Sequence, residues 1–504
     1  MSNSNSSPIT VLKFGSSVLR SESDLPLAVH EIYREQRRGR RVLAVVSALG
    51  CTGDDLLKRA QQLGLPPRRE GLAALLETGE TAAAALLTLA LDRSGIPATF
   101  LDPTQTGLIA DGDPLDADPV TVDVPYLQEE LARAVVVIPG FVARDRAGRP
   151  TRLGRGGLER TARFFARALE ASCREIGTAR TVSPPLRVAL LGCGTVGGGV
   201  LARLLALPAL FQVTGVAVRD LHRARIPAVP RSLLTDDPAA LVEGEADVVV
   251  ELLGGREPAR SLIARALVRG RHVVTANKAL LAEEVETLAD LASRSGVSLR
   301  YSAAVGGVLP ALETVRRAAA SGRVRGIAGV LNGTCNFVLD RCVAGASFPD
   351  AVSLACVAGY AEADPTLDLD GSDAAQKLAL LIREAFGEAV PWESIPRHGI
   401  ADLDARVLAE AARKGKTVRL VASCERTETG LRASVQPFEL PPDHPFAETA
   451  GAENALLVEL EGGDRIRIAG QGAGRWPTTE AVMADLLDLS AEEESSERRE
   501  EGAA

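Results

Sequence analysis

The chain has 504 residues, too many for a single hydrophobic core, and this length predicts two to four domains. Hydrophobic residues make up 46% and charged residues 24%, as in ordinary globular proteins. The net charge is -9 and no basic stripe offsets it, which excludes a general nucleic-acid-binding protein.

Cysteine spacing and the apolar stretches limit the protein class further. The 7 cysteines form no C-x-x-C pair, so neither a disulfide framework nor a zinc site is expected. Residues 1–5 (MSNSN) lack the basic and apolar regions of a signal peptide, and the apolar stretch 72–91 is interrupted by Glu77 and Glu80. We therefore expect a cytoplasmic protein that does not interact with a membrane.

The first predicted strand leads into residues 13–17 (KFGSS), and further strands are predicted at 42–46 and 135–138. Helical patterns separate these strands, which is typical of an α/β segment, and prolines 184 and 185 end it. A lysine beside the backbone N–H groups of a glycine-rich turn is an arrangement that binds phosphate.

Several motifs of this segment resemble those of aspartate kinases, which belong to the amino acid kinase family: residues 13–18 (KFGSSV), 77–80 (ETGE), 139–141 (PGF) and 151–157 (TRLGRGG). Ser16 replaces the second glycine of the first motif, and residues 158–161 (LERT) replace Ser-Asp-Thr-Thr. Only about 25 residues then precede the next strand, which leaves no room for the kinase's nucleotide-binding half or its ACT domains. We expect residues 1–180 to be a truncated, inactive kinase-like segment, the alternative being residual binding of aspartate or a related amino acid.

A buried strand is predicted at 187–191, followed directly by residues 192–197 (GCGTVG) and an apolar helix. In G-x-G-x-x-G the first glycine allows a tight turn, the second lets a pyrophosphate approach the backbone, and the third packs helix on strand. The strand–turn–helix context makes the motif specific. The residues predicted to bind a dinucleotide are Gly192, Gly194, Thr195, Val196 and Gly197.

The next predicted strand, 213–218, ends at Arg219 and Asp220. NAD sites usually have an acidic residue at this edge, which binds the ribose 2′-hydroxyl, whereas an arginine favours the 2′-phosphate of NADP. We predict NADP(H) held by Arg219. NAD, with Asp220 on the ribose, is the alternative.

Two more buried strands are predicted at 247–253 and 272–275, and the second runs into Lys278. Ligands of doubly wound sheets bind at the carboxyl ends of the strands. Lys278 is therefore predicted to lie near the nicotinamide and the substrate, where its ammonium can hold a carboxylate or polarise a carbonyl. An ordinary lysine at a helix start is the alternative.

The densest polar cluster spans residues 359–373 (GYAEADPTLDLDGSD) and runs into an apolar helix. Asp373 and Lys377 are four residues apart and share one helix face. A surface ion pair, worth about 0.3–0.5 kcal/mol, is one interpretation. The apolar helix and the crowded carboxylates favour a buried pair instead, in which the carboxylate keeps the lysine charged and able to donate a proton.

The motifs of residues 186–490 follow one another as in homoserine dehydrogenases: 275–278 (TANK), 301–310 (YSAAVGGVLP), 331–337 (LNGTCNF), 359–377 and 472–478 (GAGRWPT). The resemblance implies an oxidoreductase that interconverts L-aspartate 4-semialdehyde and L-homoserine with NADP(H), in threonine and methionine biosynthesis. It also implies a homodimer or a higher homo-oligomer.

The resulting fold class is α/β with three folded parts. The truncated kinase-like segment, 1–180, precedes a Rossmann-type doubly wound domain at 186–302 that is completed by 465–490. An α+β substrate and dimerisation domain is expected at 303–464. Residues 491–504 are charged and small, and we expect them to form a disordered tail.

The resemblance implies roles for the polar cluster. Lys377 would donate the proton to the aldehyde oxygen, with Asp373 as its partner and as a ligand of the substrate. Glu362 would bind the amino group of homoserine, and Asp368 would support that pocket.

Further positions matched by the resemblance would contact the cofactor or a cation. Lys278, Gly359 and Gly474 would lie at the nicotinamide cofactor. Backbone carbonyls of the 301–310 loop would hold a monovalent cation, Na+ or K+, at Ser302, Val305, Gly307 and Leu309. Many family members carry an acidic residue where this chain has Ser302, so that position offers a cation no charge. A glycine-rich connecting loop without a cation is the alternative.

Two other functions are compatible with parts of the sequence. One is a different NADP-dependent reductase, but the polar residues of the 362–377 stretch argue against it. The other is a non-catalytic regulatory partner. The kinase motifs are degraded while Lys278, Glu362, Asp373 and Lys377 are all present, which favours an active dehydrogenase. A bifunctional kinase–dehydrogenase with residual ligand binding on the kinase side is a further alternative.

Overall fold

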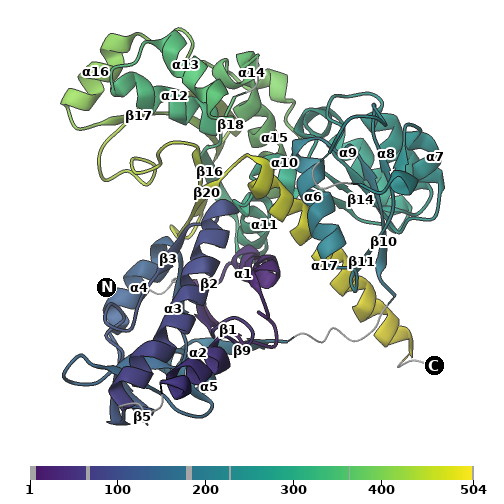
Figure 1. Cartoon of the computed structure of the whole chain (residues 1–504). Coiled ribbons are helices and arrows are strands. Elements are labelled where there is room, and N and C mark those ends of the chain that lie inside the picture. The colour runs from purple at the N-terminus through teal and green to yellow at the C-terminus, as the bar shows by residue number, and fades with distance from the viewer. Residues whose placement is uncertain (1–6, 64–68, 178–183, 226–228, 362–363, 502–504) are drawn as a thin grey trace. The chain divides into compact units, whose positions relative to one another are not determined.

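The computed structural model describes residues 7–63, 69–177, 184–225, 229–361 and 364–501 (Figure 1). The chain divides into two compact units, Met1–Thr181 and Val182–Ala504, which we call the N-terminal and C-terminal units.

The N-terminal unit is built around a five-stranded parallel sheet. Its strand order is β3-β6-β2-β1-β9, with bounds Ala98–Phe100, Val135–Pro139, Arg41–Val46, Ile9–Phe14 and Ser172–Ile176. Its helices of ten or more residues are α1 (Leu25–Arg37), α2 (Thr52–Gln62), α3 (Arg69–Arg93), α4 (Val124–Arg133) and α5 (Gly157–Ala168). Strands β1 and β6 are buried along their whole length, as expected for parallel strands covered by helices.

A second, smaller sheet completes this unit. Its order is β5-β4-β7-β8, with bounds Asp116–Thr121, Ile109–Asp113, Val142–Arg144 and Pro150–Arg152. Helix α3 packs against β6, β3 and β8 and buries Ala83, Leu87 and Leu91. By length and composition α3 could cross a membrane, but a core helix of this kind passes the same test.

The C-terminal unit begins with a six-stranded parallel sheet. The order is β12-β11-β10-β13-β14-β15, with bounds Leu234–Thr235, Phe211–Ala217, Leu186–Leu191, Val248–Glu251, His272–Thr275 and Leu299–Arg300. Numbered along the chain this is the 3-2-1-4-5-6 order of a dinucleotide-binding sheet. Val188 and Leu190 face one core of this sheet, and Ala189 and Leu191 face the other. The prediction of a Rossmann-type domain is confirmed.

Helices connect these strands and position the ligand-facing ends of the sheet. They are α6 (Thr195–Ala206), α7 (Pro238–Glu243), α8 (Ala259–Val268) and α9 (Lys278–Arg294). Asp237 and Asn277 cap α7 and α9, because each side-chain oxygen accepts a backbone N–H of the first turn.

The remaining part of the C-terminal unit is α+β, as predicted. An antiparallel sheet has the order β18-β17-β16-β19-β20, with bounds Gly430–Leu440, Thr417–Thr427, Val324–Val330, Glu453–Leu460 and Arg465–Gln471. Its helices are α10 (Ser302–Val305), α11 (Ala311–Ser321), α12 (Gly333–Val343), α13 (Phe348–Val357), α14 (Thr366–Leu369), α15 (Ser372–Phe386) and α16 (Ala405–Arg413). Side chains from α11, α12 and α15 share one core with one face of the sheet.

Two predicted boundaries need correction. The 465–471 stretch, which we assigned to the Rossmann domain, forms β20 and pairs with β19 in the antiparallel sheet. Only α17 (Arg475–Glu501) returns to the Rossmann part, where it packs on α6. The tail expected to be disordered from residue 491 is helical as far as Glu501, because it continues α17 and Arg300 pairs with Glu492.

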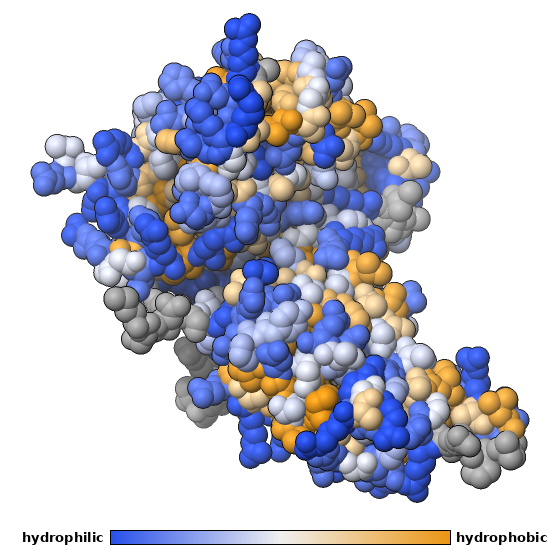
Figure 2. Space-filling model, turned by 90° about the vertical axis from the view of Figure 1, so that its left-hand side faces the viewer, coloured by the Kyte–Doolittle hydropathy of each residue, from blue (hydrophilic) through white to orange (hydrophobic). Residues whose placement is uncertain are grey.

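Apolar residues on the face drawn in Figure 2 lie in several patches separated by hydrophilic residues, as is normal for a protein surface.

Candidate active site

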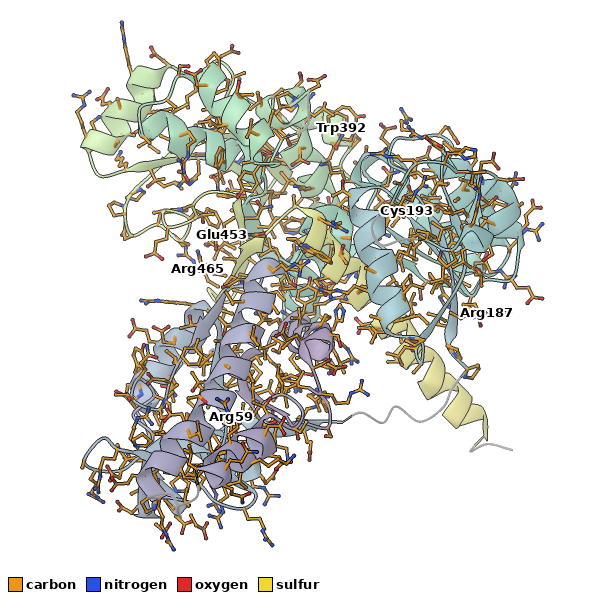
Figure 3. The ribbon with its side chains drawn as sticks, in the orientation of Figure 1. Arg59, Arg187, Cys193, Trp392, Glu453 and Arg465 are labelled. Carbon is orange, nitrogen blue, oxygen red and sulfur yellow. The ribbon has the colours of Figure 1, made fainter. Side chains whose placement is uncertain are left out.

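The turn between β10 and α6 has the geometry of a phosphate cradle. Gly192 has φ 99°, and a Cβ there would lie 2.6 Å from the Leu252 carbonyl oxygen. A Cβ on Gly197 would lie 2.1 Å from the Gly192 oxygen, so the helix packs directly on the turn. Gly194, by contrast, caps α6, and a Cβ on this residue would meet nothing within 4 Å. Cys193 is labelled in Figure 3 at this turn. The open side of this glycine-rich turn, together with the start of α6, fits a pyrophosphate.

The end of β11 carries positive charge toward the same turn. Asp220 is directed into its own loop, because its carboxylate accepts the backbone N–H groups of His222 at 2.8 Å and Arg223 at 3.2 Å. Arg225 donates to the Asp220 carbonyl oxygen. Burial raises the pKa of the Cys193 thiol in the glycine-rich turn, and the positive charge of Arg225 opposes that rise. Arg219 itself is exposed.

The carboxyl ends of β13 and β14 are fixed by a buried carboxylate. Glu251 accepts the Thr275 hydroxyl at 2.6 Å and the Leu253 N–H at 2.8 Å. The Asn277 amide then donates to the Gly255 oxygen at 2.7 Å. Lys278, the first residue of α9, therefore follows directly after the carboxyl end of β14.

Asp373 joins Lys278 and Lys377. One oxygen of its carboxylate pairs with Lys278, and the other lies 2.9 Å from the Lys377 Nζ. The Asp373 side chain is 2% exposed and that of Lys377 7%, so the surface ion pair is excluded. Burial by itself would raise the pKa of Asp373, but the two ammonium charges outweigh burial and hold this pKa below its ordinary value.

Lys377 has a second fixed partner and one remaining donor. Its Nζ donates to the Leu331 carbonyl oxygen at 2.8 Å, and that oxygen also accepts the Asn454 amide at 3.0 Å. An ammonium has three N–H donors, so within the described residues one stays available for a substrate oxygen.

Asn332 holds the carboxylates of this cluster in place. Its amide donates to Asp368 at 2.7 Å and to Asp373 at 2.8 Å. Its side-chain oxygen caps α12 by accepting the Cys335 N–H at 2.7 Å. Burial and the neighbouring Asp373 charge raise the pKa of Asp368, while the Asn332 hydrogen bond acts against that rise. The 331–337 motif contains Asn332, but the sequence predicted no role for this residue.

For the predicted site residues Gly359 and Gly474 the structure gives the backbone conformation. Gly359, φ 76°, follows α13, and Gly474, φ 121°, precedes α17; both backbones favour glycine. The Thr334 hydroxyl donates to the Tyr360 oxygen at 2.7 Å and ties the start of the acidic loop to α12. Glu362 lies outside the described residues.

Family models match three parts of the chain. The "Homoserine dehydrogenase, NAD binding domain" model matches residues 192–302, and the "Homoserine dehydrogenase" model matches residues 310–487. The "Amino acid kinase family" model matches residues 8–179. Homoserine dehydrogenases of Corynebacterium glutamicum and Mycobacterium tuberculosis are 39% and 40% identical to this chain over 60% of its length, and the matches cover 71% and 72% of those proteins.

The chain belongs to the homoserine dehydrogenase family.

Solved structures agree with this assignment. A homoserine dehydrogenase from Thiobacillus denitrificans has a TM-score of 0.57 at 38% identity, covering 61% of this chain and 73% of that one. A hyperthermophilic archaeal homoserine dehydrogenase in complex with NADPH has a TM-score of 0.52 at 25% identity, covering 61% and 98%. As a homoserine dehydrogenase, the protein is an oxidoreductase with a nicotinamide-cofactor domain and an amino-acid-kinase-like N-terminal region.

The loop predicted to hold a cation in this homoserine dehydrogenase contains carbonyls that are already in use. The Ser302 oxygen accepts the Gly306 N–H at 3.4 Å, and the Leu309 oxygen accepts the Ala311 N–H at 2.7 Å. Carbonyl oxygens have a second lone pair, so ligation stays geometrically open. The acidic side chains of Glu313 and Asp485 also lie close to this loop.

Ser302 itself carries no charge, but two acidic side chains lie beside it. The Ser302 Oγ lies 2.6 Å from the Glu313 Oε1 and 2.9 Å from the Asp485 Oδ1, and its single O–H can donate to one of these two oxygens. Glu313 lies on α11, 11 residues further along the chain, whereas Asp485 lies on α17, 183 residues away, so the sequence around Ser302 could not reveal Asp485.

In the kinase-like region, the lysine and the glycines expected to bind phosphate contact other side chains. Lys13 is paired with Glu159 and lies 3.0 Å from Glu175. Leu158 fills the space beside two glycines of the former turn: it would lie 3.7 Å from a Cβ on Gly15 and 2.6 Å from a Cβ on Gly140. Burial lowers the pKa of Lys13, but the two glutamates outweigh burial and raise it.

Proposed function

We propose that this homoserine dehydrogenase catalyses the interconversion of L-aspartate 4-semialdehyde and L-homoserine through the Lys278–Asp373–Lys377 cluster. The observation that carries the proposal is the buried Asp373 carboxylate shared by two lysines. One lysine extends from the carboxyl edge of the Rossmann sheet, and the other lies on the substrate domain's helix α15.

When bound, the reduced nicotinamide supplies a hydride to the aldehyde carbon. Lys377 holds the aldehyde oxygen with its remaining N–H and gives it a proton, while the Asp373 carboxylate 2.9 Å away holds the Lys377 Nζ in place. The Leu331 oxygen and Asp373 fix the direction of that N–H, which reduces the entropic cost of reaching the transition state. Lys278 orients the substrate from the cofactor side.

The substrate's amino group requires carboxylates. We propose Glu362 as its direct ligand, with Asp368 and Asp373 completing the pocket. The Asn332 amide supports this arrangement because it separates two carboxylates that would otherwise repel each other.

We assign NADP(H) as the preferred cofactor. Gly192, Gly194 and Gly197, with the backbone of Thr195 and Val196, would hold the pyrophosphate. Arg219 would bind the 2′-phosphate, and the capped Asp220 carboxylate supports this because it is engaged with backbone N–H groups. Gly359, Gly474 and Lys278 would border the nicotinamide.

Two further proposals concern ligation and assembly. The backbone carbonyls of Ser302, Val305, Gly307 and Leu309 would hold Na+ or K+, and the carboxylates beside Ser302 favour a cation there. The protein would act as a homodimer or larger homo-oligomer.

For the kinase-like region we propose a structural or ligand-sensing role without phosphoryl transfer. Lys13 is neutralised by glutamates, and Glu159 places negative charge in the first turn of α5, where a phosphate would need positive potential.

Oxidation of NADPH, followed at 340 nm with L-aspartate 4-semialdehyde, tests the dehydrogenase. Lys377→Ala should lower kcat by roughly 10²-fold or more, the scale of general acid catalysis. Lys414→Ala is the matched control, since this lysine pairs with Glu410 on exposed α16. A higher kcat/KM with NADPH than with NADH is also expected. A folded, NADPH-binding protein without turnover would favour the regulatory alternative.

A further inference from the structure

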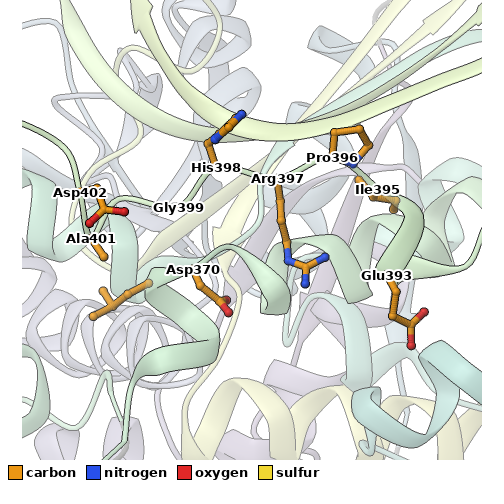
Figure 4. A pocket seen from close by; sticks show the side chains of 10 residues that line it. Asp370, Glu393, Ile395, Pro396, Arg397, His398, Gly399, Ala401 and Asp402 are labelled. Carbon is orange, nitrogen blue, oxygen red and sulfur yellow. The ribbon is translucent and has the colours of Figure 1, made fainter.

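An open cavity of about 550 Å³ lies in the substrate domain, apart from the lysine cluster (Figure 4). One wall is the junction between α14 and α15, at Leu369 and Asp370. The other wall is the segment 393–402. None of the residues that line it belongs to the proposed catalytic groups.

Four charged side chains line this cavity, and within the described residues they have no ion-pair partner within 4 Å: Asp370, Glu393, Arg397 and Asp402. In Figure 4 the side chains of Arg397, Asp370 and Glu393 point to the same side of the cavity. An unpaired set of both signs around one cavity is complementary to a ligand that carries both signs.

The charges of the lining define the ligand further. One guanidinium can bind one carboxylate through two parallel hydrogen bonds. Three carboxylates line the cavity besides this guanidinium, so the cavity has an excess of negative charge and fits a ligand with more than one cationic group. The Arg397 guanidinium also lies 5.1 Å from the centre of the Trp392 ring, whose buried Nε1 has no hydrogen-bond partner among the described residues (Figure 3).

The same wall is connected to the catalytic helix. The Leu369 oxygen accepts the Ile400 N–H at 2.8 Å, and a Cβ on Gly399 would lie 2.0 Å from that oxygen, so the two walls are in backbone contact. Asp370 in turn accepts the Ser372 N–H at 2.8 Å in the first turn of α15. This is the helix that carries Asp373 and Lys377.

We propose that the cavity is a regulatory site for a free amino acid with a basic side chain. The carboxylate of the ligand binds Arg397, and its two cationic groups bind Asp370, Glu393 and Asp402. Occupation links the 393–402 segment to the start of α15 and changes the KM for the aldehyde substrate. The change in KM rests on the proposed dehydrogenase function, whereas binding does not.

Binding is measured on the full chain by tryptophan fluorescence. The chain has 2 tryptophans, so Trp476→Phe isolates the signal of Trp392. L-lysine and L-arginine should each give a saturable change. Cadaverine, which lacks the carboxylate, should bind roughly tenfold more weakly, and glutarate, which lacks cationic groups, should give no change.

Variants locate the site. Arg397→Gln and Asp402→Asn should each weaken binding by roughly tenfold or more, and Arg406→Gln, an exposed arginine on α16 outside the cavity, should not. Absence of a saturable change up to about 20 mM, or equal affinity in Arg397→Gln and the parent protein, overturns the proposal.

The proposed regulation is tested by a measurement separate from binding, the KM for the aldehyde substrate. At saturating ligand the KM for L-aspartate 4-semialdehyde should shift in the parent protein and stay constant in Arg397→Gln. Binding without a shift in KM overturns regulation and leaves the binding site standing. A chain without any turnover contradicts the proposed function instead, because the fluorescence titration does not depend on turnover.

Discussion

Buried amides, rather than the charged residues alone, give the site its geometry. Asn332 separates Asp368 from Asp373, and Asn454 fixes the carbonyl that Lys377 binds. The carboxylates lie 36 and 41 positions after Asn332. Sequence spacing found the Asp373–Lys377 pair because both lie on one helix. It could not find the asparagines, because their partners are brought close only by tertiary folding.

Asn332 both holds the carboxylates of Asp368 and Asp373 and caps α12, and the variants Asn332→Ala and Asn332→Ser separate these two roles. Both remove the amide donors, so kcat should fall roughly 10–100-fold and the acid limb of the pH profile of kcat/KM should move to higher pH as the pKa of Asp368 rises further. Serine also caps helices well, so only the alanine variant should lose about 1 kcal/mol of stability from the α12 cap. An unchanged pH profile in the serine variant contradicts the role.

The buried carboxyl group of Glu80 should make the stability of the N-terminal unit depend on pH. Burial raises its pKa to about 7, against the opposing influences of Arg152 and the Ala48 N–H. The folded state therefore holds this proton more tightly than the unfolded state, and the contribution of Glu80 to stability falls as pH rises from its ordinary pKa of 4.5 to about 7.

Glu80→Gln should remove this pH dependence. Relative to the parent protein, the variant should gain about 1–3 kcal/mol of local stability between pH 5 and pH 8. Hydrogen exchange of peptides from α3, compared between the two proteins at each pH, measures the difference. Glu70→Gln, an exposed residue paired with Arg149, is the control and should show none. An equal pH slope in parent and Glu80→Gln contradicts the shifted pKa.

At the scale of elements, the contact between α6 and α17 closes the cofactor domain. Gly199 on α6 allows this approach, because a Cβ there would lie 2.3 Å from the Thr479 Oγ1. Arg203 adds an ion pair to Glu480 at 2.8 Å and lies 5.0 Å from the centre of the Trp476 ring. The small residue is thus required by packing rather than by backbone conformation.

Gly199→Ala should push α17 away from α6. Overpacking of this kind costs about 1–3 kcal/mol, and we expect that loss in the unfolding transition followed by Trp476 fluorescence in a Trp392→Phe background, together with a higher KM for NADPH. Gly71→Ala in α3, where a Cβ meets nothing within 4 Å, should instead be neutral or stabilising by up to about 1 kcal/mol. Equal effects of the two substitutions would argue against the packing explanation.

At the scale of the whole molecule, the two units differ in what surrounds their expected ligand-binding residues. The dehydrogenase part retains open space at Gly194 and a donor on Lys377. In the kinase-like unit, Leu158 and Glu159 occupy or neutralise the corresponding features.

The full chain, given MgATP and L-aspartate, should form no acyl phosphate that hydroxylamine can trap, while the same preparation oxidises NADPH with L-aspartate 4-semialdehyde. Lys13 is held by two glutamates, and a phosphate could reach its ammonium only by displacing both. Hydroxamate above the rate of a sample without protein would show that the kinase side is active.

The sequence by itself determined the fold class, the cofactor turn, the Asp373–Lys377 pair and the loss of the kinase motifs, because these depend on residues close together in the chain. It misassigned β20 and the end of α17, since strand pairing and helix continuation depend on distant partners. Only the tertiary structure decided that Asp373 is shared with Lys278 and that carboxylates from α11 and α17 meet Ser302. The physical reason is that local patterns specify helices and strands, whereas the environment of a charge is set by the segments that fold against it.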